Sequence, residues 1–575
     1  MNTLKLTFKN NIQGVFFVIK ELKTKQFWKT ICKNSEYADF IDVLKKQYEN
    51  NRVGVYESLK YSSRQKFYET GDRADFEKLY FQKREYLSAV AMLALIYEDN
   101  EEYLNELQDI IWNICDEPTW ILPAHIDDDY DKSSTYIDLF SAETGFALSE
   151  ICSLLGKRMN KNILIRTQKS IKERIIDVYL NYSFPWETAD CNWGAVCGGA
   201  VGGVLIYNAP EIFEEQKDRL ISTMNCFLMS YPSDGTCLEG HSYWLYGFGY
   251  YCLFADLTYR YSHGEINLMQ GKKIKNIACY MQRNFLKGNS TVSFSDGTRE
   301  GRTNIDIQYY LNKIFPDDVH ILPKEVMKYD GVNINWHSYL RGILYYNPTL
   351  KSNYNDNSNY YLQDAGQFIA NREKYSFVIK AGNNDEPHNH NDIGSFIISD
   401  SSGQVFCDLG AGKYTKDYFT EHRYEYLCTS SLGHSVPIVD GYPQKAGKEY
   451  SGSIVCLDND TVSVELSKAY GIERLKCLTR TATLKENGIL ISDTIDSEEL
   501  SVTERFITLL EPKIENDSVV VGNIILSYDS SKADLSIKVE KFETHSFEAE
   551  ELPVYCIDFV LKNDVDKIDL LFEIK

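Results

Sequence analysis

The chain lacks a long apolar run and a regular cysteine framework. Near the amino terminus the apolar run extends only from Gly14 to Ile19, and no small-residue cleavage site follows it. Neither an export signal nor a membrane span is therefore expected. The 14 cysteines include no CxxC pair, which is typical of buried small hydrophobes in a reducing compartment and not of disulfides. These absences predict a cytoplasmic protein.

Basic residues are also in deficit. The chain has 61 Lys and Arg against 83 Asp and Glu, a formal net charge of −22. Such a field repels nucleic-acid backbones and anionic bilayers, so neither is expected as a partner. Exposed charges more than about 8 Å apart are screened at physiological salt. A local arginine cluster could therefore still hold a short anionic substrate.

Tyrosine, in contrast, is abundant, with 41 copies against 28 Phe and 7 Trp. Amphipathic rings suit polar ring-shaped ligands such as sugars, because the flat face stacks while the hydroxyl forms hydrogen bonds. A bias in base composition that also enriches Asn, Lys and Ile is the simpler explanation. Composition alone therefore does not establish a sugar ligand.

Residues 1–345 show the apolar spacing of helices. The pattern is clear over residues 140–155, and Pro210 is placed to open a further helix. Several antiparallel helical hairpins in succession predict an α/α bundle, toroid or solenoid. Roughly the first 80 residues are expected to form a helical extension of this domain.

Residues 346–360 form a polar, Asn-rich connector, and residues 361–575 alternate like strands. Asn487-Gly488 is the strongest hairpin signal in the chain. No succession of strand, helix and strand indicates a parallel sheet. The sequence therefore predicts an α+β multidomain chain that ends in an antiparallel β-sandwich.

The sharpest local signal is EPHNHNDIGSF, at the beginning of the β part. If this segment is a strand, His388, His390 and Asp392 project to one face. Asp408 and His434 follow downstream, and imidazole with carboxylate is a common zinc ligand set. Taken singly, each has a structural alternative: a buried histidine, or an aspartate that forms a turn.

The helical half offers two further groups. Asn192 precedes a glycine-rich helix whose glycines suit close helix packing, since no phosphate-binding spacing is present. A glycine-punctuated turn then carries Glu239, His241, Tyr243 and Tyr246 into an aromatic helix. Such a stripe is often core, but Tyr243 is expected near a helix amino terminus, where positive potential favours the phenolate.

Seven blocks between residues 120 and 445 together resemble the heparinase II/III-like polysaccharide lyases. In order they are IDLFSAETGFAL, CNWGAVCGG, DGTCLEGHSYWLY, FSDGTREGR, HNHNDIGSF, CDLGAG and LGHSVPIVDG. The resemblance implies an incomplete α/α toroid followed by an antiparallel β-sandwich. It also implies cleavage of uronate-containing polysaccharides by β-elimination.

The resemblance assigns roles to six positions. It implies that Asn192 neutralises the substrate carboxylate, that Tyr243 and His388 are catalytic, and that His390, Asp408 and His434 bind a metal. The metal is expected to be structural zinc, with calcium as the alternative. Two departures concern the substrate: Trp193 stands where several relatives have His, and His241 replaces the usual Pro.

Further candidates surround these positions. Tyr246, one turn after Tyr243, competes for the catalytic assignment, and Tyr414 follows the CDLGAG block. Arg299 and Arg423 could hold a carboxylate or sulfate through paired hydrogen bonds. Surface salt bridges are the alternative for both arginines.

The function expected from these features is β-elimination of glycosaminoglycan-like oligosaccharides, with heparan-type substrates first. Tyr243 is expected as acid, and also as base if both proton transfers occur on one face of the sugar, whereas His388 is the base in the opposite geometry. The two rings should meet around one sugar acid. One alternative is a toroid hydrolase that uses paired carboxylates such as Asp138 and Asp234. Others are a non-catalytic carbohydrate-binding relative and a zinc amidohydrolase, although no barrel pattern supports the latter. A homo-oligomer is left open.

Overall fold

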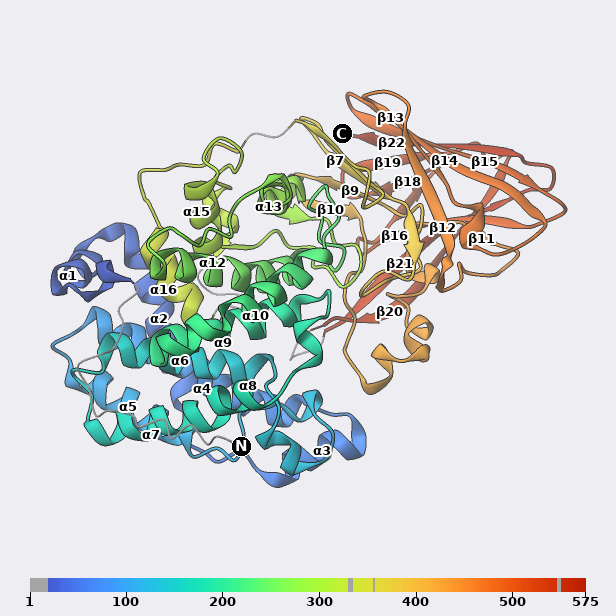
Figure 1. The fold of residues 1–575 in the computed structure, drawn as a ribbon. Coiled ribbons are helices and arrows are strands. Elements are labelled where there is room, and N and C mark those ends of the chain that lie inside the picture. Colours follow the sequence, from blue (N-terminus) through green and yellow to red (C-terminus); the bar gives the residue numbers. More distant parts are fainter. Residues whose placement is uncertain (1–18, 329–334, 355–356, 546–549) are drawn as a thin grey trace. The chain divides into compact units, whose positions relative to one another are not determined.

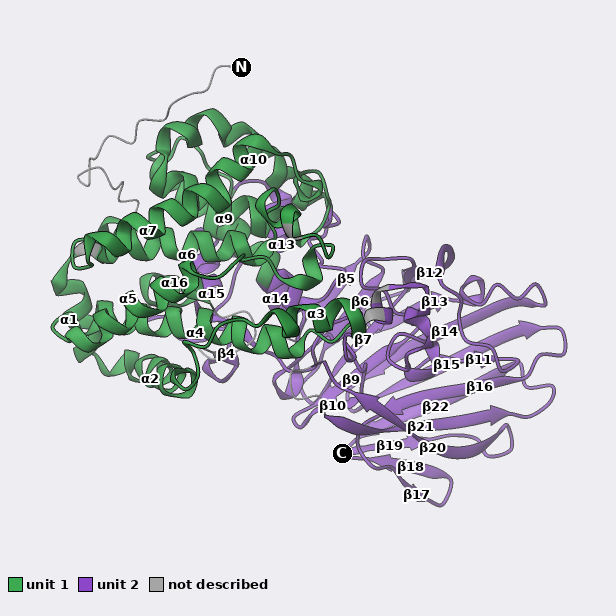
Figure 2. Ribbon diagram, turned by 90° about the horizontal axis from the view of Figure 1, so that it is seen from below, with its two compact units in different colours: residues 1–229, 246–269, 333–348 green, residues 230–245, 270–332, 349–575 purple. Residues whose placement is uncertain are grey.

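The computed structural model describes residues 19–328, 335–354, 357–545 and 550–575 (Figure 1). The chain divides into two compact units, each discontinuous in sequence (Figure 2). The helical unit takes Met1–Met229, Tyr246–Met269 and Asn333–Pro348, and the sheet unit takes Ser230–Leu245, Gln270–Val332 and Thr349–Lys575. Nearly all of the apolar run at residues 14–19, and connector residues 355–356, lie outside the described residues.

The helical unit consists of helices joined by short turns. They are α1 (Lys25–Lys33), α2 (Ala38–Arg52), α3 (Tyr61–Thr70), α4 (Ala74–Ile96), α5 (Glu101–Cys115), α6 (Leu139–Leu155), α7 (Lys161–Ile171), α8 (Asp177–Asn181), α9 (Asn192–Asn208), α10 (Pro210–Met229), α12 (Gly249–Tyr261) and α16 (Trp336–Tyr345). Pro210 opens α10 as the sequence predicts. None of the helices in the described ranges is both long and apolar enough to cross a bilayer.

Helix α9 lies against α6, α10 and α12 and owes this position to its glycines. A Cβ at Gly202 would stand 2.3 Å from the ring of Phe254 on α12, and one at Gly203 would stand 2.4 Å from Phe146 on α6. Real Cβ atoms do not approach so closely, so only glycine permits this packing. The packing role predicted for these glycines is thus confirmed.

The sheet unit begins with short elements before residue 349. They are α11 (His241–Tyr243), α13 (Lys272–Ala278), α14 (Tyr280–Arg283), α15 (Ile305–Ile314), β1 (Phe285–Leu286), β2 (Ser290–Thr291), β3 (Thr303–Asn304) and β4 (Met327–Lys328). β1 pairs with β2 antiparallel, and β3 pairs with β4 in parallel.

Three larger antiparallel sheets follow (Figure 1). The first has the order β10-β9-β7-β6-β5, with β5 (Asn359–Leu362), β6 (Gln367–Asn371), β7 (Ser376–Lys380), β9 (Phe396–Asp400) and β10 (Gly403–Phe406). The second has the order β11-β16-β21-β20, with β11 (Ile438–Val439), β16 (Val502–Thr508), β20 (Ala533–Glu543) and β21 (Glu551–Leu561).

The third and largest sheet has the order β17-β18-β19-β22-β15-β14-β13-β12-β8. Its strands are β8 (Gly382–Asn384), β12 (Gly447–Cys456), β13 (Thr461–Glu465), β14 (Leu475–Lys485), β15 (Gly488–Ser497), β17 (Lys513–Glu515), β18 (Ser518–Val521), β19 (Ile524–Ser527) and β22 (Lys567–Ile574). The predicted hairpin joins β14 to β15, but Gly488 pairs with Lys485, so the turn is Glu486 and Asn487.

One hydrophobic core joins the three sheets. Phe396 of β9, Phe506 of β16 and Phe572 of β22 are fully buried, and their ring centroids lie 5.5 to 5.6 Å apart. Each aromatic side chain contributes roughly 1.5–3 kcal/mol by leaving water. The predicted antiparallel β-sandwich is therefore confirmed, with its interior closed by side chains from every sheet.

A buried ion cluster lies beside these rings. Arg480 of β14 pairs with Asp493 of β15 at 2.7 Å and with Glu504 of β16 at 2.8 Å, and all three side chains are fully buried. The arginine also donates to two backbone carbonyls. Burial and the neighbouring Asp493 raise the pKa of Glu504 well above its usual value. The two acids therefore share one guanidinium, and Glu504 holds its proton more tightly than an exposed glutamate does.

Three glycine turns from separate sequence blocks pack together in this unit. Gly240 has φ +100°, and a Cβ there would lie 3.0 Å from Gly297 Cα. Gly410 has φ +67°, and a Cβ there would lie 2.1 Å from the Gly297 carbonyl oxygen. Only glycine combines these backbone conformations with such close approach. The turns fix the spacing of the residues that precede or follow them, Tyr243, Asp296 and Asp408.

Replacing Arg480 should lower the free energy of unfolding of the sandwich. Arg480→Met leaves Asp493 and Glu504 without their cation, and removing one partner of a buried pair costs about 3–5 kcal/mol. Urea denaturation monitored on the sheet unit measures this loss. Arg474→Met, which breaks an exposed pair with Asp440, should cost less than about 1 kcal/mol. Equal losses in both variants would contradict the ion cluster's role.

A methyl group at the glycine contact should be equally damaging. Gly410→Ala adds left-handed strain and a backbone clash, together roughly 2–5 kcal/mol. Gly441→Ala is the matched control, because Gly441 has φ +78° but nothing within 4 Å of its Cβ position. Thermal melting of the two variants should separate them, with the larger shift at Gly410. A Gly410 variant that melts with the control would refute the close packing.

Candidate active site

Tyr243 and His388 lie next to each other in the sheet unit. Tyr243 closes the short helix α11, and residues 230–245 belong to this unit although they precede its three larger sheets by more than a hundred positions. The ring centroids of Tyr243 and His388 are 4.4 Å apart, with an interplanar angle of 36°. The structure thus brings together the phenol and the imidazole that the sequence pairs.

The HxH segment is not the strand that the sequence predicts. β8 ends at Asn384 and β9 begins at Phe396, and the residues between them form turns. His388 has φ +55°, a left-handed conformation that no extended strand contains. His388 and His390 converge nonetheless, whereas Asp392 forms an ion pair of 2.8 Å with the buried Lys380.

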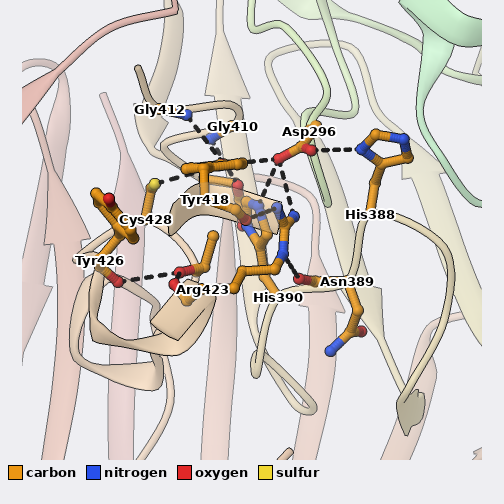
Figure 3. A network of polar contacts seen from close by, with 12 residues as sticks. Asp296, His388, Asn389, His390, Gly410, Gly412, Tyr418, Arg423, Tyr426 and Cys428 are labelled. Carbon is orange, nitrogen blue, oxygen red and sulfur yellow. Dashed lines mark hydrogen bonds and ion pairs between the residues drawn. The ribbon is translucent and has the colours of Figure 1, made fainter. Parts of the chain in front are cut away.

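Both histidines converge on Asp296, a fully buried carboxylate (Figure 3). Oδ2 accepts from His388 Nδ1 at 2.6 Å, and Oδ1 accepts from His390 Nε2 at 3.1 Å. Three more donors reach the same carboxylate: Tyr414 Oη at 3.2 Å, Tyr418 Oη at 2.8 Å and Arg423 Nη2 at 3.1 Å. Asp296 is the centre of the polar network.

The network keeps Asp296 ionised. Burial by itself would raise the pKa of this carboxyl, but the hydrogen bonds from His388 and His390 and the charge of Arg423 bring it well below the usual value. A carboxylate only accepts hydrogen bonds, so His388 Nδ1 and His390 Nε2 are the protonated nitrogens. The neutral His388 ring then carries its lone pair on Nε2, and the neutral His390 ring on Nδ1.

His390, Asp408 and His434 form the group predicted to bind a metal. All three are fully buried, and one ligand atom from each lies within 4.8 Å of the others. His390 Nδ1 is buried and has no hydrogen-bond partner among the described residues. A buried lone pair without a donor is costly unless a cation takes it. The residues therefore fit a metal ion.

The bonding of His434 points the same way. Its Nε2 donates to the Cys428 carbonyl at 2.7 Å, while Nδ1 lies 2.9 Å from Asp408 Oδ2. If the His434 ring were neutral, its unprotonated Nδ1 would face the Asp408 Oδ2 oxygen, and both atoms are hydrogen-bond acceptors. A proton or a metal ion must therefore lie between these two atoms. Although burial lowers the pKa of His434, the Asp408 carboxylate outweighs it and raises the pKa.

Tyr414 links Tyr243 to the same carboxylate. The Tyr243 and Tyr414 hydroxyls are 3.1 Å apart. Because Tyr414 gives its proton to Asp296, its oxygen accepts from Tyr243, so the donor direction runs from Tyr243 through Tyr414 to Asp296. Burial raises the pKa of Tyr243. The expectation of a helix-stabilised phenolate was therefore wrong, because desolvation disfavours the charged form at this position.

The remaining candidates of the sheet unit have local partners. His241 donates from Nε2 to the Arg302 carbonyl at 2.6 Å, and burial lowers its pKa to about 4. Glu239 is buried in the turn before α11. Arg423 is committed to Asp296 and to the carbonyls of Asn389 and Tyr418. Arg299 has a buried Nη1 with no hydrogen-bond partner among the described residues.

A second group of candidates lies in the helical unit. Asn192 is the first residue of α9 and is partly exposed. Gly247 packs close to it, since a Cβ there would lie 3.1 Å from Asn192 Cβ. The hydroxyl of Tyr246 donates to Glu143. Burial raises the pKa of Glu143 to about 7, so Tyr246 is held by an acid that the sequence did not single out.

The carboxylates of the hydrolase alternative have structural tasks. Asp138 caps α6 by accepting from Ser141 N at 2.8 Å, and it also contacts His125 Nδ1. Asp234 accepts from the backbone N–H groups of Thr236 and Ala365. Both are therefore occupied with backbone or histidine donors, which weakens their interpretation as a catalytic pair.

Sequence reasoning missed Asp296 and Tyr418, which meet inside the polar network. Asp296 lies in the quoted block FSDGTREGR, where a turn-forming Asp-Gly pair masks its role. The apolar residues around Asp296 imply that it is buried, and this could have marked it as a candidate. Tyr418 carries no such signal, because it is one of many tyrosines.

Comparisons with known proteins agree with this fold. Residues 357–544 match the family model described as heparinase II/III-like, C-terminal. No curated protein sequence matches the chain. A solved structure of a heparinase III is 13% identical, covers 95% of this chain and 91% of its own, and superposes with a TM-score of 0.60.

Two other solved structures are similar. Heparan sulfate lyase HepC from Pedobacter heparinus is 14% identical with a TM-score of 0.59, covering 86% of this chain and 76% of its own. Chondroitin AC lyase of Streptomyces coelicolor A3, solved with chondroitin sulphate, is 9% identical with a TM-score of 0.56, covering 96% and 82%. The resemblance and the toroid-plus-sandwich fold predicted from the sequence are thus confirmed: residues 357–544 match the heparinase II/III-like C-terminal model, and the chain shares its fold with these polysaccharide lyase structures.

Proposed function

We propose that the chain cleaves uronate-containing, glycosaminoglycan-like glycans by β-elimination and leaves an unsaturated uronate. The observation that carries this proposal is the 4.4 Å approach of the Tyr243 and His388 rings, both hydrogen-bonded into one network around Asp296. A phenol and an imidazole at this spacing can serve one sugar residue. The fold shared with polysaccharide lyases supports the same reaction class.

The reaction needs two proton movements and one charge stabilisation. The weakly acidic C5 proton of the uronate must be removed, and the departing C4 oxygen must be protonated. Neutralising the uronate carboxylate stabilises the enolate-like charge that develops, and such stabilisation is usually the largest catalytic contribution. We assign that task to Asn192, whose place at the start of α9 suits an anion because helix amino termini are electropositive.

The network gives the other two groups different roles. His388 presents an Nε2 lone pair in its neutral form, as a base requires, and its side chain retains 22% exposure beside the fully buried Asp296. Tyr243 stays a protonated phenol because burial raises its pKa. It can act as the acid when its hydroxyl turns from Tyr414 to the leaving oxygen. Tyr243 as acid and His388 as base is therefore the favoured assignment.

Heparan-type oligosaccharides are our first choice of substrate. The similar structures carry the names heparinase III, heparan sulfate lyase and chondroitin AC lyase, so their substrates are acidic polysaccharides. All 14 cysteines are free thiols, which is in keeping with a reducing cytoplasm. We propose on that ground that the substrate is a short imported oligosaccharide.

We also propose that zinc occupies the site of His390, Asp408 and His434, with calcium as the alternative. Two imidazoles and one carboxylate suit zinc better than calcium, which prefers an all-oxygen shell. The ion would supply fixed positive charge that orders the turns between β8 and β9. Those turns present His388, so the metal would act structurally.

Loss of the Tyr243 hydroxyl or of the His388 imidazole should strongly reduce turnover. A panel of heparan, chondroitin, hyaluronan, alginate and pectin oligosaccharides should yield a near-ultraviolet absorbing product from at least one uronate, heparan first. Tyr243→Phe and His388→Ala should each lower kcat by roughly 10²–10⁴-fold, since each removes a positioned proton donor or acceptor.

The control for these variants is Tyr375→Phe, a buried tyrosine of the same unit whose hydroxyl donates to the carbonyls of Lys485 and Gly488. It should keep wild-type kcat. Products without the absorbing double bond would indicate a hydrolase. Binding without turnover would indicate a non-catalytic relative, and full activity in both ring variants would remove the site assignment.

Removing the metal should lower stability even without substrate. An ion whose free concentration is 1,000 times its Kd stabilises the fold by about 4 kcal/mol. A strong chelator or His434→Ala should therefore lower the Tm by roughly 5–15 °C. Elemental analysis should find about one zinc in the wild type and none in the variant. His422→Ala, an exposed histidine paired with Glu425, is the control. Unchanged melting after chelation, with no bound cation, would refute the metal site.

A further inference from the structure

The Asp296 carboxylate joins three parts of the site that are far apart in sequence. Its Oδ2 holds His388 and Tyr414, and its Oδ1 holds His390. His388 is the proposed base, His390 is a predicted metal ligand, and Tyr414 accepts from Tyr243. Every link ends on the same fully buried group.

Geometry leaves little freedom at this centre. The Asp296 turn is fixed by the contacts of Gly297 with Gly240 and Gly410, and Ala411 N donates to the Gly297 carbonyl at 3.3 Å. Arg423 and Tyr418 occupy further positions on Oδ1. The carboxylate therefore cannot rotate away from either histidine without breaking several hydrogen bonds.

We propose that Asp296 is the positioning residue of the site: it fixes the tautomers of His388 and His390 and, through Tyr414, the position of the Tyr243 hydroxyl oxygen. The link to turnover rests on the proposed function, and the link to His390 does not. Carboxylates that accept from a metal-bound histidine orient the ring and raise its basicity. Here one carboxylate does this for a metal ligand and for a base together.

An amide in place of the carboxylate should break this arrangement. The asparagine side chain would offer one acceptor oxygen and one NH₂ donor, so it cannot accept from both histidines. In Asp296→Asn the wrong tautomer of His388 should lower kcat by roughly 10²–10⁴-fold, as expected when a histidine loses its orienting carboxylate, with KM within about threefold. Zinc affinity, measured by competition with a chromophoric chelator, should fall by roughly 10–100-fold.

Two variants separate positioning from simple damage to the fold. Asp400→Asn changes another buried carboxylate of the same unit, which accepts from Ser402 and Asn523, and should leave kcat and zinc affinity unchanged. Tyr414→Phe keeps Asp296 and its histidine bonds, so it should lower kcat by about three- to tenfold, the loss expected for one hydrogen bond, and leave zinc affinity unchanged. If Asp296→Asn does not fold, the test uses Tyr414→Phe. A lower kcat together with an unchanged zinc affinity in that variant is the expected result.

A double-mutant cycle tests whether Asp296 acts through the base. In a His388→Ala background, Asp296→Asn should cost no more than about tenfold in kcat, because the histidine that it orients is gone and only the path through Tyr414 to Tyr243 remains. A full additional loss in that background would overturn the proposal. So would a zinc affinity within about threefold of wild type in Asp296→Asn, or a wild-type chain that binds no zinc.

The outcome also separates this inference from the proposed function. If the wild type releases no unsaturated product from any uronate, the lyase assignment fails. The zinc competition then still decides whether Asp296 orients His390. If product forms and Asp296→Asn keeps wild-type kcat, the lyase assignment stands and the positioning role is lost.

Discussion

A carboxylate taken out of water must be surrounded by donors, and this requirement organises the site. Asp296 is fully buried and receives five, from two histidines, two tyrosines and an arginine. Its negative charge is stable only while they stay in place. The donors in turn are fixed in orientation by the one acceptor that they share. Stability and chemical readiness are therefore two results of the same set of contacts.

Most of the architecture could be predicted from the sequence. Apolar periodicity indicated the helices, Pro210 indicated the start of α10, and alternation indicated the antiparallel sheets, because these signals are local. The discontinuous units were not predictable, since membership of residues 230–245 and 270–332 in the sheet unit depends on contacts between distant segments.

The candidate site was predictable in membership but not in geometry. The HxH spacing identified His388 and His390, yet the strand expected there is a series of turns, because His388 adopts a left-handed conformation that spacing cannot reveal. Arg423 was a candidate for holding an anionic substrate, with a surface salt bridge as the alternative, and its guanidinium instead binds the buried Asp296. Which acid an arginine pairs with depends on the tertiary fold, so a sequence shows the charge and not its partner.

Because the two units alternate along the sequence, the segment that matches the family model lacks some residues of the candidate site. Residues 357–544 include His388, His390, Asp408 and His434, but Tyr243 and Asp296 lie upstream and fold into the same unit. A fragment trimmed to that segment would expose the cavity left by Asp296, with both histidine rings deprived of their shared acceptor. The boundary that sequence similarity draws is therefore not one along which this molecule can be divided and keep its chemistry.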